Sequence, residues 1–439
     1  MVLPSGLNIY LVSKEYGGTQ PRSFLRVMAG AFSTGAYAGL FQKRWPSGLG
    51  LDLAADFVGT EGSGGAARSD QTFDLWGRLK WIPSQRTGAS YQVRRQNHDR
   101  DAVGDDVRER RGARTDYIFS MFAGTGGDGM GFRSEAILAT SAWSSDSTAA
   151  DTLDQTVRQA QLKLRYMTPN WTVAATGMIG DARVLSGVDG RIGWVPIPGV
   201  VLAGDAYWHR HAGKRTSVGA HGAVGLYAGP FSVVGDVQFG DAVQAPAILA
   251  DSAQRAVARS IRTGIETRPL AGHVALVRRD AFLPLPYAEL GVIDGFDSST
   301  AATYVVADVK LQSSRALTLE AWYSTPTQGE APNLQPPKHG RAQITFRSKF
   351  WRTFRSGAFD LKVQVAMEYW SPGIAGLAGG NPVELEGAKY YEGFIQFQIA
   401  SFQGFWNLRN MLNSEDPYIP GLAYPISVQT FGVKWEFSN

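Results

Sequence analysis

Cysteine is absent from the sequence, and this absence excludes both a disulfide framework and thiolate zinc sites. Charged residues are also scarce, at 19% against the usual quarter of a soluble globular protein, whereas glycine is frequent, with 51 residues. The net charge of +4 is small for a chain of 439 residues, and the basic residues are dispersed. A nucleic-acid partner is not expected, because its groove would need a concentrated basic face.

Long apolar runs are lacking as well. No stretch approaches the roughly 18 apolar residues of a membrane-spanning helix, and the longest candidate, residues 192–204, carries two prolines. The first residues have neither the basic start nor the continuous apolar core of a signal peptide, so none is expected. Helix signals are scarce, and the best one, at 151–163, becomes strand alternation from Val157 on. A helical membrane protein is therefore excluded, but a β-barrel is not, because barrel strands carry no continuous apolar block.

Alternation of apolar and polar residues is what the sequence has in abundance. In 358–370, AFDLKVQVAMEYW, the apolar parity holds Phe359, Leu361, Val363, Val365, Met367 and Tyr369, and the other parity holds Asp360, Lys362, Gln364 and Glu368. Successive side chains of a strand point to opposite faces, so this segment is a strand with one apolar and one polar face. The same pattern recurs at 49–57, 72–81, 160–166, 342–350 and 430–437.

Turn spacing supplies a second regularity. Short turns such as 46–48, 83–88 and 168–170 alternate with longer connections such as 61–70 and 99–113. Short turns at one end and long loops at the other are typical of outer-membrane barrels. The fold class predicted is therefore all-β, a transmembrane antiparallel β-barrel of about 22 strands over residues 21–439. Both termini of this barrel would lie at the short-turn end.

The apolar parity is expected to face lipid, since an arginine or lysine in lipid near the midplane costs about 2–4 kcal/mol. A soluble sandwich or propeller also alternates, but we find no Greek-key or blade-length repeat to organise one. Aromatic residues collect on the apolar parity near strand ends, as in a membrane-interface girdle: Trp81, Tyr91, Tyr117, Tyr166, Trp208, Tyr323, Phe350, Tyr369 and Trp435. The predicted location is the bacterial outer membrane, with outer-membrane lipid as a partner.

Both ends of the chain are similar to one family. The C-terminal segment 394–437, with Asn407-Leu408-Arg409-Asn410, a tyrosine and proline-glycine loop and a final strand ending in an aromatic, resembles the last strands of TonB-dependent outer-membrane receptors. SGLNIYLVSK, at 5–14, resembles the end of that family's plug domain, so residues 1–20 are expected to be a plug-to-barrel connector remnant or an N-terminal tail. Two departures are that residues 1–20 are too few to hold the plug, with its TonB-contacting box, and that Ser438 and Asn439 follow the last aromatic, Phe437.

The resemblance implies uptake of a scarce ligand, such as a metal chelate. It also implies a separate or missing plug segment, or a partner protein, that fills the lumen, and a TonB-type energising complex as a further partner. Two alternatives remain: a non-transporting structural barrel that anchors a partner complex, and a passive porin. The leading hypothesis assigns ligand contact to polar lumen positions near the extracellular ends of the strands: Arg94, His98, Asp116, Tyr207, His209, His211, Trp322 and Glu368.

No catalytic residues, resident metal or cofactor are predicted, and the chain is not expected to be an enzyme. The glycines at 124–129 match a dinucleotide fingerprint, but another strand follows where that fingerprint needs a helix. His209 and His211, two residues apart on one strand face, could clamp a transition metal. We favour instead an aqueous lining that tolerates histidine.

Overall fold

The computed structural model describes most of the chain, and the remaining segments fall mainly in connections between strands. The described residues are 18–61, 69–101, 110–126, 130–147, 153–181, 184–211, 216–243, 253–281, 295, 297–333, 335–350, 353–354, 358–414 and 427–438. Residues 1–17 of the expected N-terminal connector lie outside them. No helix among the described residues is long and apolar enough to span a membrane.

Twenty-two strands form one sheet. They are β1 (Arg22–Gly30), β2 (Thr34–Arg44), β3 (Leu49–Thr60), β4 (Asp70–Ser84), β5 (Thr87–Arg100), β6 (Arg110–Gly124), β7 (Gly131–Ser147), β8 (Leu153–Met167), β9 (Trp171–Gly180), β10 (Val184–Trp194), β11 (Val200–His211), β12 (Thr216–Ala228), β13 (Phe231–Val243), β14 (Ala253–Glu266), β15 (Leu270–Arg279), β16 (Ala302–Gln312), β17 (Leu317–Gln328), β18 (His339–Ser348), β19 (Phe359–Trp370), β22 (Ala388–Ile399), β23 (Phe402–Arg409) and β24 (Val428–Ser438).

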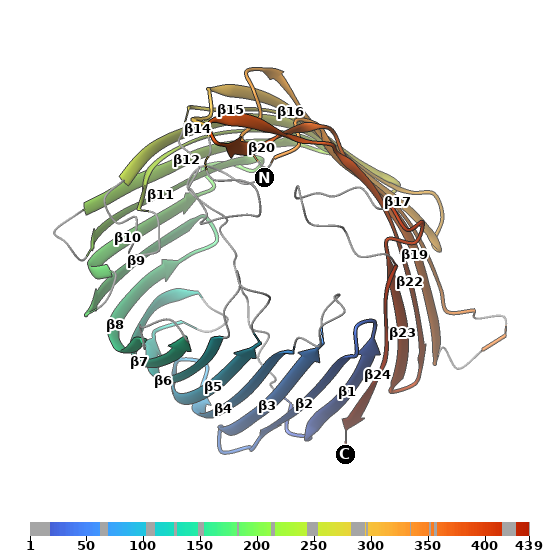
Figure 1. Cartoon of the computed structure of the whole chain (residues 1–439). Helices are drawn as coiled ribbons and strands as arrows, with labels where there is room; N and C mark the ends of the chain where they lie inside the picture. The colour runs from blue at the N-terminus through green and yellow to red at the C-terminus, as the bar shows by residue number, and fades with distance from the viewer. Residues whose placement is uncertain are drawn as a thin grey trace.

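The sheet closes on itself. Each strand pairs antiparallel with its neighbour along the chain, β19 pairs with β22, and β1 pairs with β24 from Arg22 opposite Ser438 to Gly30 opposite Thr430. The result is the ring of strands in Figure 1, with both terminal strands meeting in one seam. The predicted fold class and strand number are confirmed, and the first and last strands begin and end at the short-turn end of the barrel.

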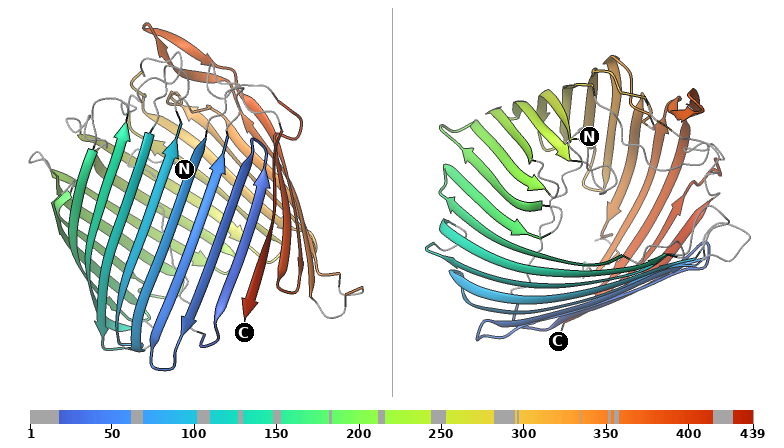
Figure 2. Two further views of the ribbon diagram at one scale, coloured as in Figure 1. Left: turned by 60° about the horizontal axis from the view of Figure 1, so that its bottom comes forward. Right: turned by 60° about the vertical axis from the view of Figure 1, so that its left-hand side comes forward.

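A second, two-stranded sheet lies outside the barrel. It is the hairpin of β20 (Gly373–Ala378) and β21 (Asn381–Leu385), inserted between β19 and β22. Figure 2 shows this hairpin projecting beyond one rim, which we call the loop end; the opposite rim is the turn end. Ala375 and Leu385 are fully buried in the hairpin, and Leu377 bridges to Gly295. By its spacing and its glycine and proline content, 372–387 is one of the longer connections of the sequence pattern, and that pattern does not predict its strand pairing.

The connections expected at the loop end are in part shorter than the pattern predicts. Strands β5 and β6 extend to Arg100 and from Arg110, so residues 99–100 and 110–113 of the expected loop at 99–113 belong to strands. The connection after β1 consists of residues 31–33 alone, and Phe32 and Ser33 take positive φ angles of 58° and 52° to make the tight reversal. Strand pairing continues past the point where side-chain alternation weakens, because backbone hydrogen bonds do not depend on side-chain polarity.

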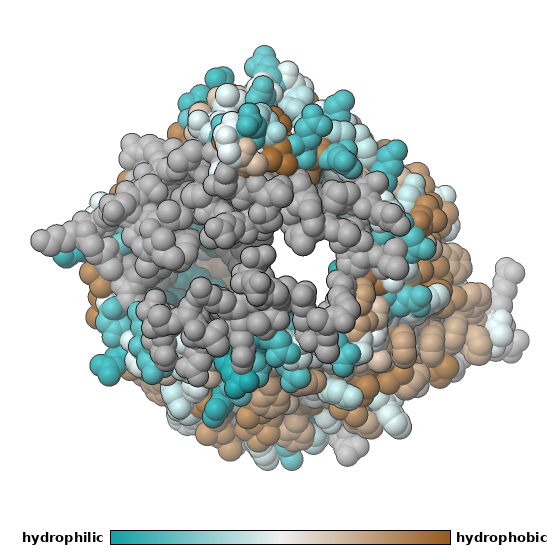
Figure 3. All heavy atoms as spheres, viewed as in Figure 1, coloured by the Kyte–Doolittle hydropathy of each residue, from teal (hydrophilic) through white to brown (hydrophobic). Residues whose placement is uncertain are grey.

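The two faces of the wall separate as the alternation predicts. On β4, Leu75, Leu79 and Trp81 are about half exposed on the outside, whereas Lys80 is buried on the inside at 3% exposure. Figure 3 shows apolar residues gathered over the outer surface and hydrophilic ones around the rim. Of the aromatic positions expected at the outer girdle, the exposed ones are Trp81, Tyr91, Tyr117, Tyr166, Trp208, Tyr323, Phe350 and Trp435.

Outward aromatics also stack in pairs at the turn end. Trp171 and Trp194 lie opposite each other on β9 and β10, with ring centroids 4.8 Å apart and planes inclined by 13°. Trp435 and Phe437 stack along β24 at 5.0 Å. Rings of this kind, with an apolar body and in tryptophan a polar N–H, are suited to the boundary between an apolar phase and water.

The face assignment predicts opposite outcomes for adjacent residues of β19. Replacing Val365, which is exposed on the outer face, with arginine is expected to prevent barrel assembly, because it places a charge in lipid at about 2–4 kcal/mol. Val363, on the same parity, should behave alike. Gln364 points inward, where its amide donates to Gln343 at 3.0 Å, so Gln364→Arg should be tolerated. Heat-modifiable mobility of the outer-membrane fraction measures assembly, and equal yields for Val365→Arg and Gln364→Arg would contradict the assignment.

Candidate functional site: the polar inner wall of the barrel

The inner wall is built from the polar parity of every strand, so residues that are far apart in sequence become neighbours across the ladder. The eight sequence-predicted site residues all lie on strands and point to the inside. They form three groups on different sides of the ring in Figure 1, on β5 and β6, on β11, and on β17 and β19. The three groups are described in turn.

The group on β5 and β6 is a set of ion pairs. Arg94 lies directly opposite Asp116 in the ladder, but its guanidinium pairs with Asp74 on β4, with Nε 2.9 Å from Oδ2. Asp116 accepts a hydrogen bond from Arg114 at 2.8 Å. His98, four residues further towards the loop end, lies 3.1 Å from the Thr72 hydroxyl through Nδ1. The predicted residues Arg94 and Asp116 are thus brought together, each held by a partner of opposite charge.

The group on β11 is a column of three side chains. Tyr207 stacks on His209 with ring centroids 5.1 Å apart, and His209 meets His211 edge to face at 6.3 Å. His209 Nε2 lies 2.9 Å from Asp189 Oδ1 on β10, and His211 Nε2 lies 2.8 Å from the Ser217 hydroxyl on β12. The two imidazoles are therefore engaged with different neighbours. Among the described residues, no group of three or more histidine, aspartate or glutamate side chains is placed to hold a metal ion.

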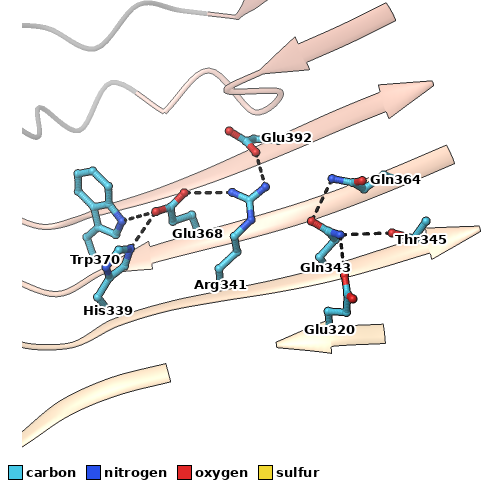
Figure 4. A network of polar contacts seen from close by, with 9 residues as sticks. All are labelled: Glu320, His339, Arg341, Gln343, Thr345, Gln364, Glu368, Trp370 and Glu392. Carbon is cyan, nitrogen blue, oxygen red and sulfur yellow. Dashed lines mark hydrogen bonds and ion pairs between the residues drawn. The ribbon is translucent and has the colours of Figure 1, made fainter. Parts of the chain in front are cut away.

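The group on β17 to β19 is the most highly connected, and we call it the Glu368 cluster: Trp322, His339, Arg341, Glu368, Trp370 and Glu392. Glu368 receives three contacts, from His339 Nε2 at 2.8 Å, from Arg341 Nη1 at 3.1 Å and from Trp370 Nε1 at 2.9 Å. The other amino group of Arg341 donates to Glu392 at 2.6 Å. Figure 4 shows this chain of contacts, which runs from β18 across β19 to Glu392 on β22.

Aromatic rings enclose the histidine of the Glu368 cluster. Trp322 packs edge to face against His339 with centroids 4.5 Å apart, and Trp370 does the same from the other side at 5.3 Å. Towards the turn end the wall continues as an amide ladder in which Gln343 bonds Glu320, Thr345 and Gln364. Trp322 and Glu368, which the sequence predicts separately, are therefore joined through His339.

Sequence reasoning missed His339, Arg341, Trp370 and Glu392. The first two stand on the polar parity of β18, and the register places Arg341 opposite both Trp322 and Glu368. A signal was present in the alternation of HGRAQ at 339–343, directly after a long connection. Its use would have required the strand register, which alternation alone does not supply.

A fourth group lies near the turn end, outside the predicted site. Asp52 on β3 is 1% exposed and meets Arg78 at 2.7 Å and Lys80 at 3.3 Å, both on β4. Gln42 on β2 adds a hydrogen bond at 3.3 Å. By contrast Asp56, four residues further along β3 towards the loop end, meets Arg26 at 3.4 Å, and both side chains are nearly half exposed. The buried Asp52 group therefore resembles a structural ion-pair network rather than a ligand contact.

Comparison with solved structures gives the same barrel. The chain is similar to the ferric enterobactin receptor of Pseudomonas aeruginosa, with a TM-score of 0.72 and 10% identity over 97% of this chain and 82% of that one. It is also similar to a siderophore receptor of Acinetobacter baumannii (0.72, 8%, 97% and 81%) and to an iron transporter of Neisseria meningitidis (0.66, 10%, 96% and 82%). No protein-family model and no curated protein matches the chain.

At these identities the likeness establishes the fold. The resemblance to TonB-dependent receptors that the C-terminal segment indicated is confirmed for the barrel. The similar structures are transport receptors by name, and the assignment of individual lumen residues of this chain to ligand contact stays a prediction.

Charge removal in the Asp52 group should be far more costly than at Asp56. Asp52→Asn leaves Lys80 and Arg78 without their buried counter-charge, and we expect a loss of about 3–5 kcal/mol in the free energy of unfolding. Asp56→Asn, on the same strand and face, breaks an exposed pair and should cost less than about 1 kcal/mol. Urea unfolding of the barrel in phospholipid vesicles measures both. Equal losses in the free energy of unfolding would show that the burial of Asp52 does not strengthen its ion pairs.

Proposed function

We propose that the chain resides in the bacterial outer membrane and takes up a scarce ligand, such as a metal chelate, through its lumen. The observation that carries the proposal is the Glu368 cluster, which places aromatic rings, a cation and carboxylates together near the loop end of the barrel. Support comes from the fold, which is shared with proteins named as a ferric enterobactin receptor, a siderophore receptor and an iron transporter. In outer-membrane barrels the longer connections are extracellular, so the Glu368 cluster would face an arriving ligand.

The chemistry of the Glu368 cluster suits a large, partly aromatic and partly anionic ligand. The rings of Trp322 and Trp370 offer apolar edges, and Arg341 keeps further N–H donors beyond the two that Glu368 and Glu392 occupy. Those two carboxylates fix the guanidinium plane before a ligand arrives, so less conformational entropy is lost on binding. The metal belongs to the cargo in this proposal, and the protein contacts the chelating groups around it.

The groups on β5–β6 and β11 would form the remaining contacts. Tyr207 and His209 present a stacked pair held by Asp189, and His98 lies at the same end of its strand. The remaining three predicted residues already bond to neighbours within the wall: Arg94, Asp116 and His211. We assign to them a role in holding neighbouring wall side chains in place. The proposed ligand contacts are thus distributed around the lumen, as expected where a bulky ligand is held from several sides.

A polypeptide that fills the lumen is part of the proposal. A barrel of 22 strands is wide enough to leak solutes, and transporters of this size are plugged. The inner wall offers both signs of charge, for example Arg347 with Asp360 and Arg262 with Asp308, to which a folded polar plug could bond. We infer that the filling segment is not part of residues 21–439, and that a TonB-type complex acting on such a segment would supply the energy. Residues 1–20 would lead from that segment into β1.

Uptake should depend on the Glu368 cluster. Trp322→Ala and Glu368→Gln are each expected to lower uptake of radiolabelled ferric enterobactin by about tenfold or more. The first removes an aromatic contact surface. The second weakens the hold on Arg341, and a hydrogen bond to a charged group contributes about 1.5–3 kcal/mol. Lys310→Gln is the matched control, since it removes an exposed ion pair with Glu320, which lies on the same strand as Trp322 but towards the turn end. Unchanged uptake in both cluster variants, with normal assembly, would contradict the site; a uniform fall in all three would indicate a general defect of the wall.

Conductance tests the filling segment separately. In planar bilayers residues 21–439 alone should give large, poorly selective conductance, and a lumen-filling partner or N-terminal segment should abolish it. A barrel that is already closed would contradict the proposal, since its own loops would then seal it. Large conductance that persists in whole cells, with uptake that never saturates, would identify a passive porin instead.

A further inference from the structure

Two arginines face each other on the outer surface of the barrel. Arg259 on β14 and Arg278 on β15 are direct partners in the ladder. Both are exposed and both stand on the outward parity, because the next outward pair below them is Ile261 opposite Leu276, with side chains about half exposed. Arg278 is the second-last residue of β15, which runs towards the loop end. Figure 1 shows β14 and β15 adjacent in the wall.

This arrangement is unfavourable as it stands. Like charges directly opposite each other on a sheet repel, and a charged side chain on the lipid face is tolerated only as it nears the membrane boundary. Within the described part of the chain neither guanidinium has an ion pair or hydrogen-bond partner. Asp280, two residues beyond Arg278, makes no ion pair with it, and the flanking ladder residues are Val237 beside Arg259 and Thr303 beside Arg278.

Basic residues predominate among the charged exceptions to the apolar outer face at the loop end, although Asp154 is also exposed there and Asp99 pairs with Arg111 at 3.5 Å. Besides this pair, the exposed outward strand positions towards the loop end include Arg95, Arg158, Arg210 and Lys389. Inward arginines behave differently, since Arg262, three residues from Arg259, pairs with Asp308 at 3.2 Å. Basic residues are thus matched by carboxylates inside the barrel, whereas the outward pair has no acidic neighbour in contact.

We propose that Arg259 and Arg278 together bind the phosphate of an anionic lipid in the outer leaflet, with its acyl chains lying on the apolar surface of Ile261, Leu276 and Val237. One phosphate between two guanidiniums relieves their repulsion and accepts several charge-assisted hydrogen bonds. The apolar surface directly below supplies the contact for hydrocarbon. The inference rests on the outer-membrane location proposed above and is independent of the transported ligand.

The test uses the full chain, purified in detergent and titrated with diphosphorylated lipid A in mixed micelles. The double variant Arg259→Gln/Arg278→Gln should bind about 30-fold more weakly, since each basic residue near an anionic surface contributes about 1 kcal/mol. Arg262→Gln, which removes one positive charge from the inner face of β14, should bind as the unchanged protein does. The double lysine variant, which keeps both charges, should lose only a few-fold.

Each other outcome overturns the inference. Equal binding by the double glutamine variant, or an equal loss in Arg262→Gln, would mean that the outward pair does not hold the lipid. If dephosphorylated lipid A binds as tightly, the two arginines do not recognise the phosphate. Inorganic phosphate that binds as tightly as the lipid would show an anion site with no preference for a membrane component. Heat-modifiable mobility, measured first for every variant, separates these results from a failure of assembly and so from failure of the proposed location.

Discussion

Closure of the sheet through the pairing of β1 with β24 is the constraint on which the rest of the structure depends. An open sheet of this size would leave two edges of unpaired N–H and C=O groups, and in an apolar phase each unpaired group costs several kcal/mol. The seam between residues 22–30 and 430–438 removes both edges. Once the ring is closed, every strand has one face inside the barrel and one face outside it, and alternate side chains must be suited to one or the other.

The inner environment is organised by pairs across strands rather than by segments of sequence. Arg347 with Asp360, Arg94 with Asp74 and the Glu368 cluster all join residues that the ladder brings opposite or diagonal to each other. In these examples the cation is held by a carboxylate on a neighbouring strand, so the wall is polar without a single dominant sign. A surface of this kind can contact a hydrated ligand or a folded plug, and the Glu368 cluster adds the aromatic rings that a purely electrostatic wall would lack.

The outer environment follows the opposite rule, and its few charges stand out for that reason. Apolar side chains cover the middle of the wall, aromatic pairs such as Trp171 with Trp194 lie at the turn end, and basic residues such as Arg278 lie towards the loop end. The apolar middle suits the hydrocarbon of a membrane, and the aromatic and basic residues at its two ends suit the boundaries with the headgroups. The two rims of this barrel therefore differ on the outside as well as in their connections.

The sequence by itself determined the fold class, the approximate strand number and the faces of the clearly alternating strands, because a period of two is a local property that needs no knowledge of neighbours. It also marked Trp322 and Glu368 as inward polar positions. Only the tertiary structure decided that these two meet through His339, that Asp52 is buried between Arg78 and Lys80, and that 372–387 forms a hairpin. Those outcomes depend on the register between strands, since a shift of two residues would keep every face and change every partner.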